Sequence, residues 1–291
     1  LKRNYKQKRL IFTTDLKNAL KNSDIIFICV GTPTKKKTNS ANLKYVFNVA
    51  NQLKKIINKY KIIITKSTVP VTTGDKIQSI LKNLHKKKLV DVVSNPEFLR
   101  EGEAIRDFLY PDRVVIGTDS KKANKILKSL YFPIIKKTSR YFQTSRRGAE
   151  MIKYASNAFL ATKISYINEL ANLCEKADVN IKDISTGIGL DQRIGDRFLR
   201  AGPAYGGSCF PKDTRALVDT ANKFNIDLSI IKSVIKSNDL RKNLLTNRIG
   251  KFLNNKFLNK TVTFLGVTFK PNTDDMREAS SIPMIKFLNK K

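Results

Sequence analysis

The sequence predicts an α/β protein whose first half forms a doubly wound sheet of parallel strands. Short apolar runs rich in β-branched residues alternate there with amphipathic helical segments, which is the pattern of βαβ units. Turn residues end the first apolar runs, as expected where buried strands reach the loops at their carboxyl ends. From about residue 145 the apolar period becomes helical, which indicates a second, mainly helical domain.

The individual elements follow from the spacing of the apolar residues. Strands are predicted at 24–30, 61–65, 89–94 and 113–117, with helices at 45–57 and 77–84, a long helix at 149–178, further helices at 214–225 and 227–254, and then a strand at 261–266 and a helix at 281–288. One strand and one helix do not make a domain, so the carboxyl end is expected to be truncated. The amino end is expected to be truncated too, because no glycine-rich strand-to-helix turn precedes the first strand.

Length and composition exclude several classes of protein. The chain has 291 residues, enough for about two domains, and 41% of them are hydrophobic, as in globular proteins. No apolar run approaches the roughly 20 residues that span a bilayer, so we expect a soluble, cytoplasmic protein with no membrane partner. Three cysteines argue against a secreted disulfide framework and against a zinc site. We expect Cys29, in a buried strand, and Cys174, on an apolar helix face, to be inert.

The chain has a single histidine, His85, which lies in a basic turn. Without a second histidine there is no Ser-His-Asp or Cys-His catalytic set and no histidine-rich metal site. We therefore expect His85 to be a solvated loop residue and the protein to hold no metal.

The formal net charge is +32, from 56 Lys and Arg against 24 Asp and Glu. Such a field attracts polyanions, so a polyanion-binding protein is one function class to weigh. The lysines are spread along the whole chain, for example at 35–37, 86–88 and 136–137, and no arginine-aromatic stripe accompanies them. The charge is therefore better explained by a lysine-rich composition on an enzyme with anionic substrates, without specific nucleic-acid binding.

Cys209 is the cysteine most suited to chemistry. It lies in the segment 202–213, where Gly206 and Gly207 would let backbone amides approach a ligand and leave the sulfur accessible. A thiol needs a nearby cation or helix amino terminus to act as a nucleophile near neutral pH, and Lys212 or Lys153 could supply the cation. The alternative is an ordinary loop cysteine after a turn.

Two further pairs of residues have the spacing of one helical face. Glu97 and Glu101 follow the predicted third strand and could supply a general base and a ribose or sugar contact, or form a capped surface turn. Lys153 and Asn157, on the long helix, could be a solvated face. With a thiol nucleophile they would instead form a donor pair for an oxyanion.

Several spaced motifs occur together in this chain. They are residues 30–34, 67–70, 95–102, 111–113, 153–160, 191–195, 206–213 and 266–270. In these motifs the whole chain resembles the UDP-glucose/GDP-mannose dehydrogenase family of nucleotide-sugar dehydrogenases. Phe210 after the cysteine resembles the UDP-glucose branch more than the GDP-mannose branch, and Ser208 disfavours the branch that acts on N-acetylated sugars.

The resemblance implies three parts: a Rossmann-like NAD-binding domain at 1–140, a central helical dimerisation domain at 141–255, and the start of a second Rossmann-like, UDP-sugar-binding domain at 256–291. It implies oxidation of UDP-glucose to UDP-glucuronate by two NAD+, through a thiohemiacetal and then a thioester on Cys209. GDP-mannose is the alternative substrate. A homodimer through the long helix is also expected, although core packing alone predicts the same pattern.

The resemblance also implies roles for individual residues. Beside Cys209, Lys153 and Asn157 would stabilise oxyanions, Asp213 and Thr68 would order water or a proton path, and Glu97 would act as general acid and base in thioester hydrolysis. Residues implied in the NAD site are Thr32, Thr68, Glu101, Lys212 and Arg277. Residues implied in the sugar-nucleotide site are Glu97, Phe98, Leu99, Lys153, Asn157, Arg193, Tyr205, Gly206 and Lys270.

The chain departs from the family in ways that bear on activity. The family's G-x-G-x-x-G turn and following acidic residue would lie before Leu1, the second half of the sugar-nucleotide domain would lie beyond Lys291, and the usual glycine after the first Thr-Pro loop is replaced in the segment 35–40. We therefore expect the intact gene product to be active and the 291 residues alone to be inactive.

Overall fold

The computed structural model describes residues 1–35, 38, 40–135 and 140–290. Lys36, Lys37, Lys136 and Lys137, which belong to the lysine runs noted above, lie outside the described residues. The chain divides into two compact units. The first comprises Leu1–Thr32, Leu43–Phe98 and Leu109–Glu150, and the second comprises Pro33–Asn42, Leu99–Phe108 and Met151–Lys291.

The first unit contains a mixed sheet of five strands among the described residues. The strands are β1 (Ile25–Ile28), β2 (Lys61–Thr65), β3 (Val90–Ser94), β4 (Arg113–Gly117) and β5 (Arg140–Thr144), and they lie in the order β1-β2-β3-β4-β5. The first three strands are parallel to one another, as are β4 and β5, whereas β3 and β4 pair antiparallel at Ser94 and Gly117. The α/β fold class is confirmed, with one antiparallel pair that the prediction of an all-parallel sheet did not include.

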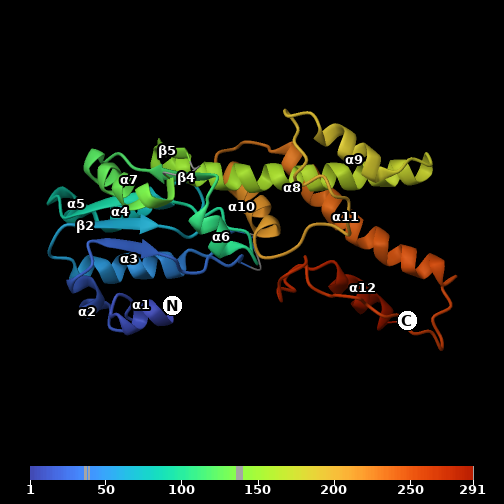
Figure 1. The fold of residues 1–291 in the computed structure, drawn as a ribbon, viewed down its shortest axis with the longest axis horizontal. Helices are drawn as coiled ribbons and strands as arrows, with labels where there is room; N and C mark the ends of the chain where they lie inside the picture. Colours follow the sequence, from blue (N-terminus) through green and yellow to red (C-terminus); the bar gives the residue numbers. More distant parts are fainter. Residues whose placement is uncertain (36–37, 39, 136–139, 291) are drawn as a thin grey trace. The chain divides into compact units, whose positions relative to one another are not determined.

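Helices cover both faces of this sheet (Figure 1). On one face, α3 (Lys44–Ile56) and α4 (Thr73–Ile80) pack against Ile63 and Val92. On the other, α7 (Lys121–Ile135) packs against Ile64 and Val93. Both groups of side chains are almost fully buried, and apolar burial of this kind supplies most of the stability of such a layered domain.

The remaining helices of the first unit are short. They are α1 (Lys2–Lys6), α2 (Leu16–Lys21) and α5 (Lys82–Lys86), and α2 is capped by Asp15, whose side chain accepts a hydrogen bond from the Asn18 amide. The predicted helix at 77–84 is instead two helices, because α4 ends at Ile80 and α5 begins at Lys82. His85 therefore lies in a helix rather than a turn, and it is exposed as expected.

The placement of Cys29 in a buried strand is wrong. β1 ends at Ile28, and Cys29 follows it as an exposed residue. β1 is the first strand of the described sheet and pairs only with β2, so its other side has no neighbouring strand to bury the residues at its end. Cys174 is buried, as expected.

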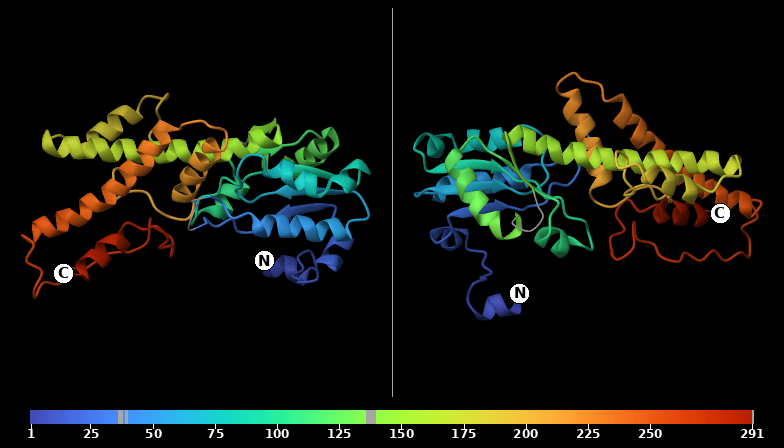
Figure 2. Two further views of the ribbon diagram at one scale, coloured as in Figure 1. Left: turned by 180° about the vertical axis from the view of Figure 1, so that it is seen from behind. Right: turned by 45° about the horizontal axis from the view of Figure 1, so that its top comes forward.

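The second unit is mainly helical. Its helices are α8 (Arg146–Lys176, in this unit from Met151), α9 (Ile181–Gly189), α10 (Phe210–Asn222), α11 (Ser229–Phe252) and α12 (Ser281–Leu288), and α6 (Ala104–Leu109) begins in it. A small core forms where Tyr154 and Ala158 of α8 meet Ala216 and Leu217 of α10. α12 lies alongside α11, as Figure 1 and both views of Figure 2 show.

The predicted strand at 261–266 is wrong. Residues 261–266 form no strand, and Leu265 is 96% exposed. A strand needs a neighbour for its backbone hydrogen bonds, and every strand among the described residues belongs to the sheet of the first unit. None of the helices in the described part of the chain is long and apolar enough to cross a membrane.

Candidate active site

Cys209 is half-buried at the amino terminus of α10, where it is the capping residue. Its carbonyl oxygen accepts a hydrogen bond of 2.8 Å from the amide of Asp213, which closes the first turn. The sulfur lies 3.6 Å from the Ser208 hydroxyl oxygen. Amide groups at a helix amino terminus stabilise negative charge placed beside them, so the fold presents this sulfur where a developing anion is favoured.

A buried carboxylate links the first turn of α10 to α8. The Asn157 side-chain amide donates to Asp213 over 2.6 Å, and the Lys212 ammonium donates to the other Asp213 oxygen over 2.6 Å. Asp213 is 1% exposed and Asn157 is 7% exposed. A charge held at such depth needs partners of this kind, because an unpaired buried ion is strongly destabilising.

Lys153 is 3% exposed, so the alternative that Lys153 and Asn157 form a solvated face is wrong. The two residues are four apart in α8 and therefore lie on the same face of the helix. The structure thus brings Cys209, Lys212, Asp213 and Asn157 into one hydrogen-bonded turn and places Lys153 on the helix face that Asn157 shares.

The two glycines before Cys209 allow another part of the second unit to approach closely. A Cβ atom at Gly206 would lie 2.5 Å from the Glu278 carbonyl oxygen, and one at Gly207 would lie 2.7 Å from the Phe269 ring. The Gly207 amide donates to the Arg277 carbonyl over 2.8 Å. These glycines are expected to let backbone amides approach a ligand, and in the structure they also admit the segment 268–278 against the cysteine turn.

Tyr205 anchors this turn. It is 5% exposed, its amide donates to the Asn238 side-chain oxygen over 2.8 Å, and its carbonyl accepts from the Asn238 amide group over 3.1 Å. Its ring meets the Phe210 ring edge-on, and burial raises the pKa of Tyr205 to about 12. Tyr205 is therefore part of the framework that holds the turn beside Gly206.

The other residues implied in the sugar-nucleotide site are more accessible. Arg193 is exposed and bonded through its guanidinium to Asp191, and Lys270 lies with its ammonium 5.6 Å from the centre of the Phe269 ring. Leu99 is half-buried in the same unit.

In the first unit, Glu97 and Phe98 are half-buried, and the Arg113 guanidinium lies 4.0 Å from the centre of the Phe98 ring.

The residues implied in the NAD site fall in both units. In the first, Thr32 donates to the Thr68 carbonyl over 2.8 Å, which ties the loop after β1 to the loop after β2. Ser67 donates to the Val30 carbonyl over 2.6 Å and strengthens the same junction. Loops at the carboxyl ends of adjacent parallel strands are where doubly wound sheets bind nucleotides, and a Cβ on Gly31 would meet no atom within 4 Å. This edge therefore fits a dinucleotide.

In the second unit, Glu101 and Arg277 belong to one hydrogen-bonded network. The Thr273 hydroxyl donates to Glu101 over 3.1 Å, and the Arg277 guanidinium is bonded to Asp275. Among the residues that the structure describes, no group of three or more His, Cys, Asp or Glu side chains could hold a metal ion.

Two buried carboxylates were not predicted from the sequence. One is Asp275, whose signal is its position two residues before an arginine already expected in the site. The other is Glu150, 2% exposed, which accepts hydrogen bonds from the backbone amides of Thr72 and Gly74. A single acidic residue among the apolar positions at the start of the long helix could have drawn attention to it.

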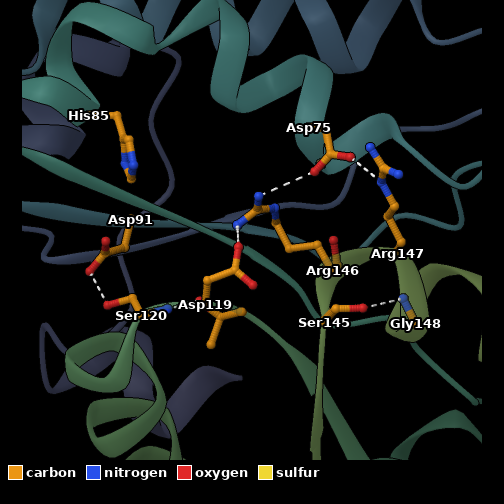
Figure 3. Close-up of polar contacts among 12 residues, drawn as sticks. Asp75, His85, Asp91, Asp119, Ser120, Ser145, Arg146, Arg147 and Gly148 are labelled. Atoms are coloured by element: carbon orange, nitrogen blue, oxygen red, sulfur yellow. Dashed lines mark hydrogen bonds and ion pairs between the residues drawn. The ribbon is translucent and has the colours of Figure 1, made fainter.

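A network of ion pairs surrounds the start of α8. Arg146 bridges Asp75 and Asp119 over 3.2 and 2.7 Å, and Arg147 also donates to Asp75 (Figure 3). The same figure shows Ser120 donating to Asp91, over 2.6 Å. These contacts join elements of the first unit and contain none of the expected site residues.

Comparison with known proteins gives a consistent result. Residues 1–135 match the NAD binding domain, and residues 147–240 the central domain, of the UDP-glucose/GDP-mannose dehydrogenase family. A UDP-glucose 6-dehydrogenase of Rhizobium meliloti is 46% identical over 282 residues, which cover 96% of this chain and 64% of that protein. One of Rickettsia prowazekii is 47% identical over 288 residues, covering 99% and 66%.

The solved structure of a UDP-glucose dehydrogenase from Pyrobaculum islandicum superposes with a TM-score of 0.90 at 34% identity, covering 99% of this chain and 66% of that one. The chain thus spans slightly less than two thirds of the length of these relatives.

Proposed function

The chain belongs to the UDP-glucose/GDP-mannose dehydrogenase family, and we propose that it carries the catalytic residues for oxidising UDP-glucose to UDP-glucuronate. The primary alcohol of the sugar, two NAD+ and one water would give the carboxylate, two NADH and three protons. Relatives that match along nearly the whole chain are named for this activity. NAD+, when bound, would supply the hydride acceptor for each of the two oxidations.

The observation that carries the proposal is the first turn of α10, with Cys209, Lys212 and the buried Asp213, hydrogen-bonded to Asn157 of α8. The Cys209 sulfur would add to the carbon of the intermediate aldehyde and form a thiohemiacetal. Loss of hydride converts this adduct to a thioester, and water cleaves the carbon–sulfur bond to release the acid and return the thiol. A cysteine can therefore complete a four-electron oxidation without histidine.

Asn157 and Lys153 would stabilise the negative oxygen that develops in these steps. The Asn157 side-chain nitrogen has two hydrogens, and the bond to Asp213 uses one of them. This bond fixes the plane of the amide and leaves the second hydrogen available to an oxyanion. Donors fixed in advance are worth about 3 kcal/mol each in other enzymes, because no reorganisation is needed in the transition state.

Water and proton handling would fall to residues of both units. We assign Asp213 and Thr68 to the ordering of water or of a proton path, and Glu97 to general acid and base catalysis in thioester hydrolysis. Asp213 is held on both carboxylate oxygens, by Asn157 and by Lys212, so its position is defined before any ligand binds.

Ligand binding would be divided among three parts of the chain: the NAD-binding domain at 1–140, the central domain at 141–255 and the start of the UDP-sugar-binding domain at 256–291. Thr32 and Thr68 would hold NAD at the carboxyl edge of the sheet, and Glu101, Lys212 and Arg277 are the other residues that we assign to NAD. Glu97, Phe98, Leu99, Lys153, Asn157, Arg193, Tyr205, Gly206 and Lys270 would contact UDP-glucose.

A homodimer through α8 is part of the proposal. Phe159, Tyr166 and Leu173 recur every seven residues along this helix and are 65, 53 and 64% exposed, whereas Tyr154 and Ala158 on another side are buried. An apolar stripe at this spacing fits a second helix laid along it. We also place the protein in the cytoplasm, where three unpaired cysteines would stay reduced.

The test is NADH formation from UDP-glucose and NAD+, followed by absorbance, with these 291 residues alone and with the same residues completed to the length of the relatives. The completed protein is expected to form two NADH per sugar, and Cys209→Ser to abolish or stall turnover. GDP-mannose, added in competition, should reduce the rate only weakly. A completed protein that forms no NADH, or a Cys209→Ser variant of normal stoichiometry, would contradict the proposal.

A further inference from the structure

Arg277 is hydrogen-bonded to the side chain of Asp275, two residues before it. The Arg277 backbone amide and its guanidinium Nε each donate to Oδ1 of Asp275 over 2.8 Å, and Nη2 donates to Oδ2 over 2.8 Å. The carboxylate is 5% exposed, whereas the Arg277 side chain is 66% exposed. One buried acid therefore holds one accessible cation by two hydrogen bonds and the backbone of the same residue by a third.

The same short segment is tied to two other parts of the expected site. The Asp275 amide donates to the Thr273 hydroxyl over 3.1 Å, and that hydroxyl donates to Glu101 over 3.1 Å. The Arg277 carbonyl accepts from the Gly207 amide in the cysteine turn over 2.8 Å. The positions of Glu101, Arg277 and the turn before Cys209 are thus set by one set of hydrogen bonds.

The geometry leaves part of the guanidinium available. A guanidinium has five N–H donors in a fixed plane, and Asp275 uses one on Nε and one on Nη2. The three remaining donors, one on Nη2 and two on Nη1, lie in the same plane and point away from the edge that Asp275 occupies. A bidentate bond fixes the direction of those donors, which an unpaired arginine would have to order on binding at a cost in entropy.

We propose that Asp275 is a positioning residue that aims Arg277 at the anionic part of a bound dinucleotide. This inference rests on the proposed function, in which Arg277 contacts NAD, and adds the residue through which that contact is set. Glu101, held through Thr273, would be oriented by the same segment.

Electrostatics within the second unit agree with this arrangement. Hydrogen bonds to Asp275 raise the pKa of Arg277 against the effect of desolvation, and the nearby carboxylates of Asp275 and Glu101 add to the rise. Hydrogen bonds from Arg277 lower the pKa of Asp275. Both groups therefore stay ionised around neutral pH.

The experiment compares Asp275→Asn with Asp274→Asn in the protein completed to the length of its relatives. Asp274 is the adjacent acid and is exposed, so its replacement removes the same charge and leaves Arg277 held. We expect Asp275→Asn to weaken NADH binding, measured by fluorescence titration, about tenfold, which is close to the lower end of what one charge-assisted hydrogen bond contributes. KM for NAD+ should rise by a similar factor with kcat changed little, and Asp274→Asn should match the wild type.

A second pair of variants distinguishes positioning from a general structural role. Arg277→Ala should lose the same binding as Asp275→Asn, and the double variant should lose no more than either alone, because both remove one contact. Arg277→Lys keeps the charge but not the planar fork and should also bind NADH weakly, which covers the case in which Asp275→Asn fails to fold.

Either of two results would overturn the inference. In the first, folded Asp275→Asn binds NADH as tightly as the wild type does. In the second, Asp275→Asn weakens NADH binding as much in the Arg277→Ala background as it does in the wild type. A wild type that binds NADH but makes none from UDP-glucose would instead count against the proposed function while leaving the binding comparison valid.

Discussion

Replacing Glu150 by glutamine is expected to make the unfolding free energy of the chain much less dependent on pH. Glu150 is 2% exposed and accepts hydrogen bonds from the amides of Thr72 and Gly74 over 2.8 and 2.7 Å and from the Ser94 hydroxyl over 3.0 Å. Burial, together with the nearby charge of Asp75, raises its pKa to about 7 against the pull of these three bonds. A titration near neutral pH is therefore built into the first unit.

The sign of the effect follows from the proton balance. Between the ordinary pKa of 4.5 and the raised value of about 7, the folded chain holds a proton that the unfolded chain has released. The stability from this group is therefore fully present below about pH 4.5 and is lost as the pH rises through about 7. The difference of about 2.5 pKa units corresponds to roughly 3 kcal/mol as an upper bound.

The assay is denaturant unfolding of wild type, Glu150→Gln and Glu103→Gln over a pH range from about 5 to about 9. The difference between wild type and Glu150→Gln should move by up to roughly 3 kcal/mol across this range, with the wild type losing relative stability at high pH. Glu103 is exposed, so Glu103→Gln should follow the wild type. A wild-type minus Glu150→Gln difference that stays constant with pH would refute the reasoning.

Three further outcomes are expected. Asn157→Ala should lower kcat about a hundredfold with little change in KM, by stopped-flow NADH absorbance, because it removes a fixed oxyanion donor; an unchanged kcat would remove Asn157 from the chemistry. Gly207→Ala should destabilise the fold by roughly 2 kcal/mol in denaturant unfolding, because this residue has a φ of 79° and a Cβ would meet the Phe269 ring; equal stability would contradict the close approach. Phe159→Asp should convert the proposed dimer to a monomer in light scattering, whereas replacing Phe224, an exposed phenylalanine outside α8, by Asp should not.

The fold was predictable where burial was complete and poorly predictable where it was partial. The strands at 61–65 and 113–117 were located from uninterrupted apolar runs, and both are almost wholly buried. β5 was missed because its side chains are mostly exposed and carry no apolar period. The segment 261–266 has the composition of a strand but no neighbouring strand to pair with, and pairing is not encoded in the segment itself.

The candidate site, too, was only partly predictable from the sequence. Cys209, Lys212 and Asn157 were identified by residue type and spacing and Asp213 through the family resemblance, and the structure joins them through short hydrogen bonds. Glu150 was missed because its role depends on backbone amides about 76 residues away in the chain.

The two cations expected in the NAD site are each paired with a neighbouring acid, which affects how the charge of the protein acts on a ligand. Lys212 is paired with Asp213 and Arg277 with Asp275, and in each pair the acid is the buried partner, 1 and 5% exposed. Each cation is thus locally neutralised, so these side chains would offer a ligand directed donors rather than net positive charge. The excess of +32 is carried by other residues along the chain. The affinity for NAD should therefore depend weakly on salt concentration. Any attraction of polyanions to the lysine-rich surface should instead fall steeply as the salt concentration rises.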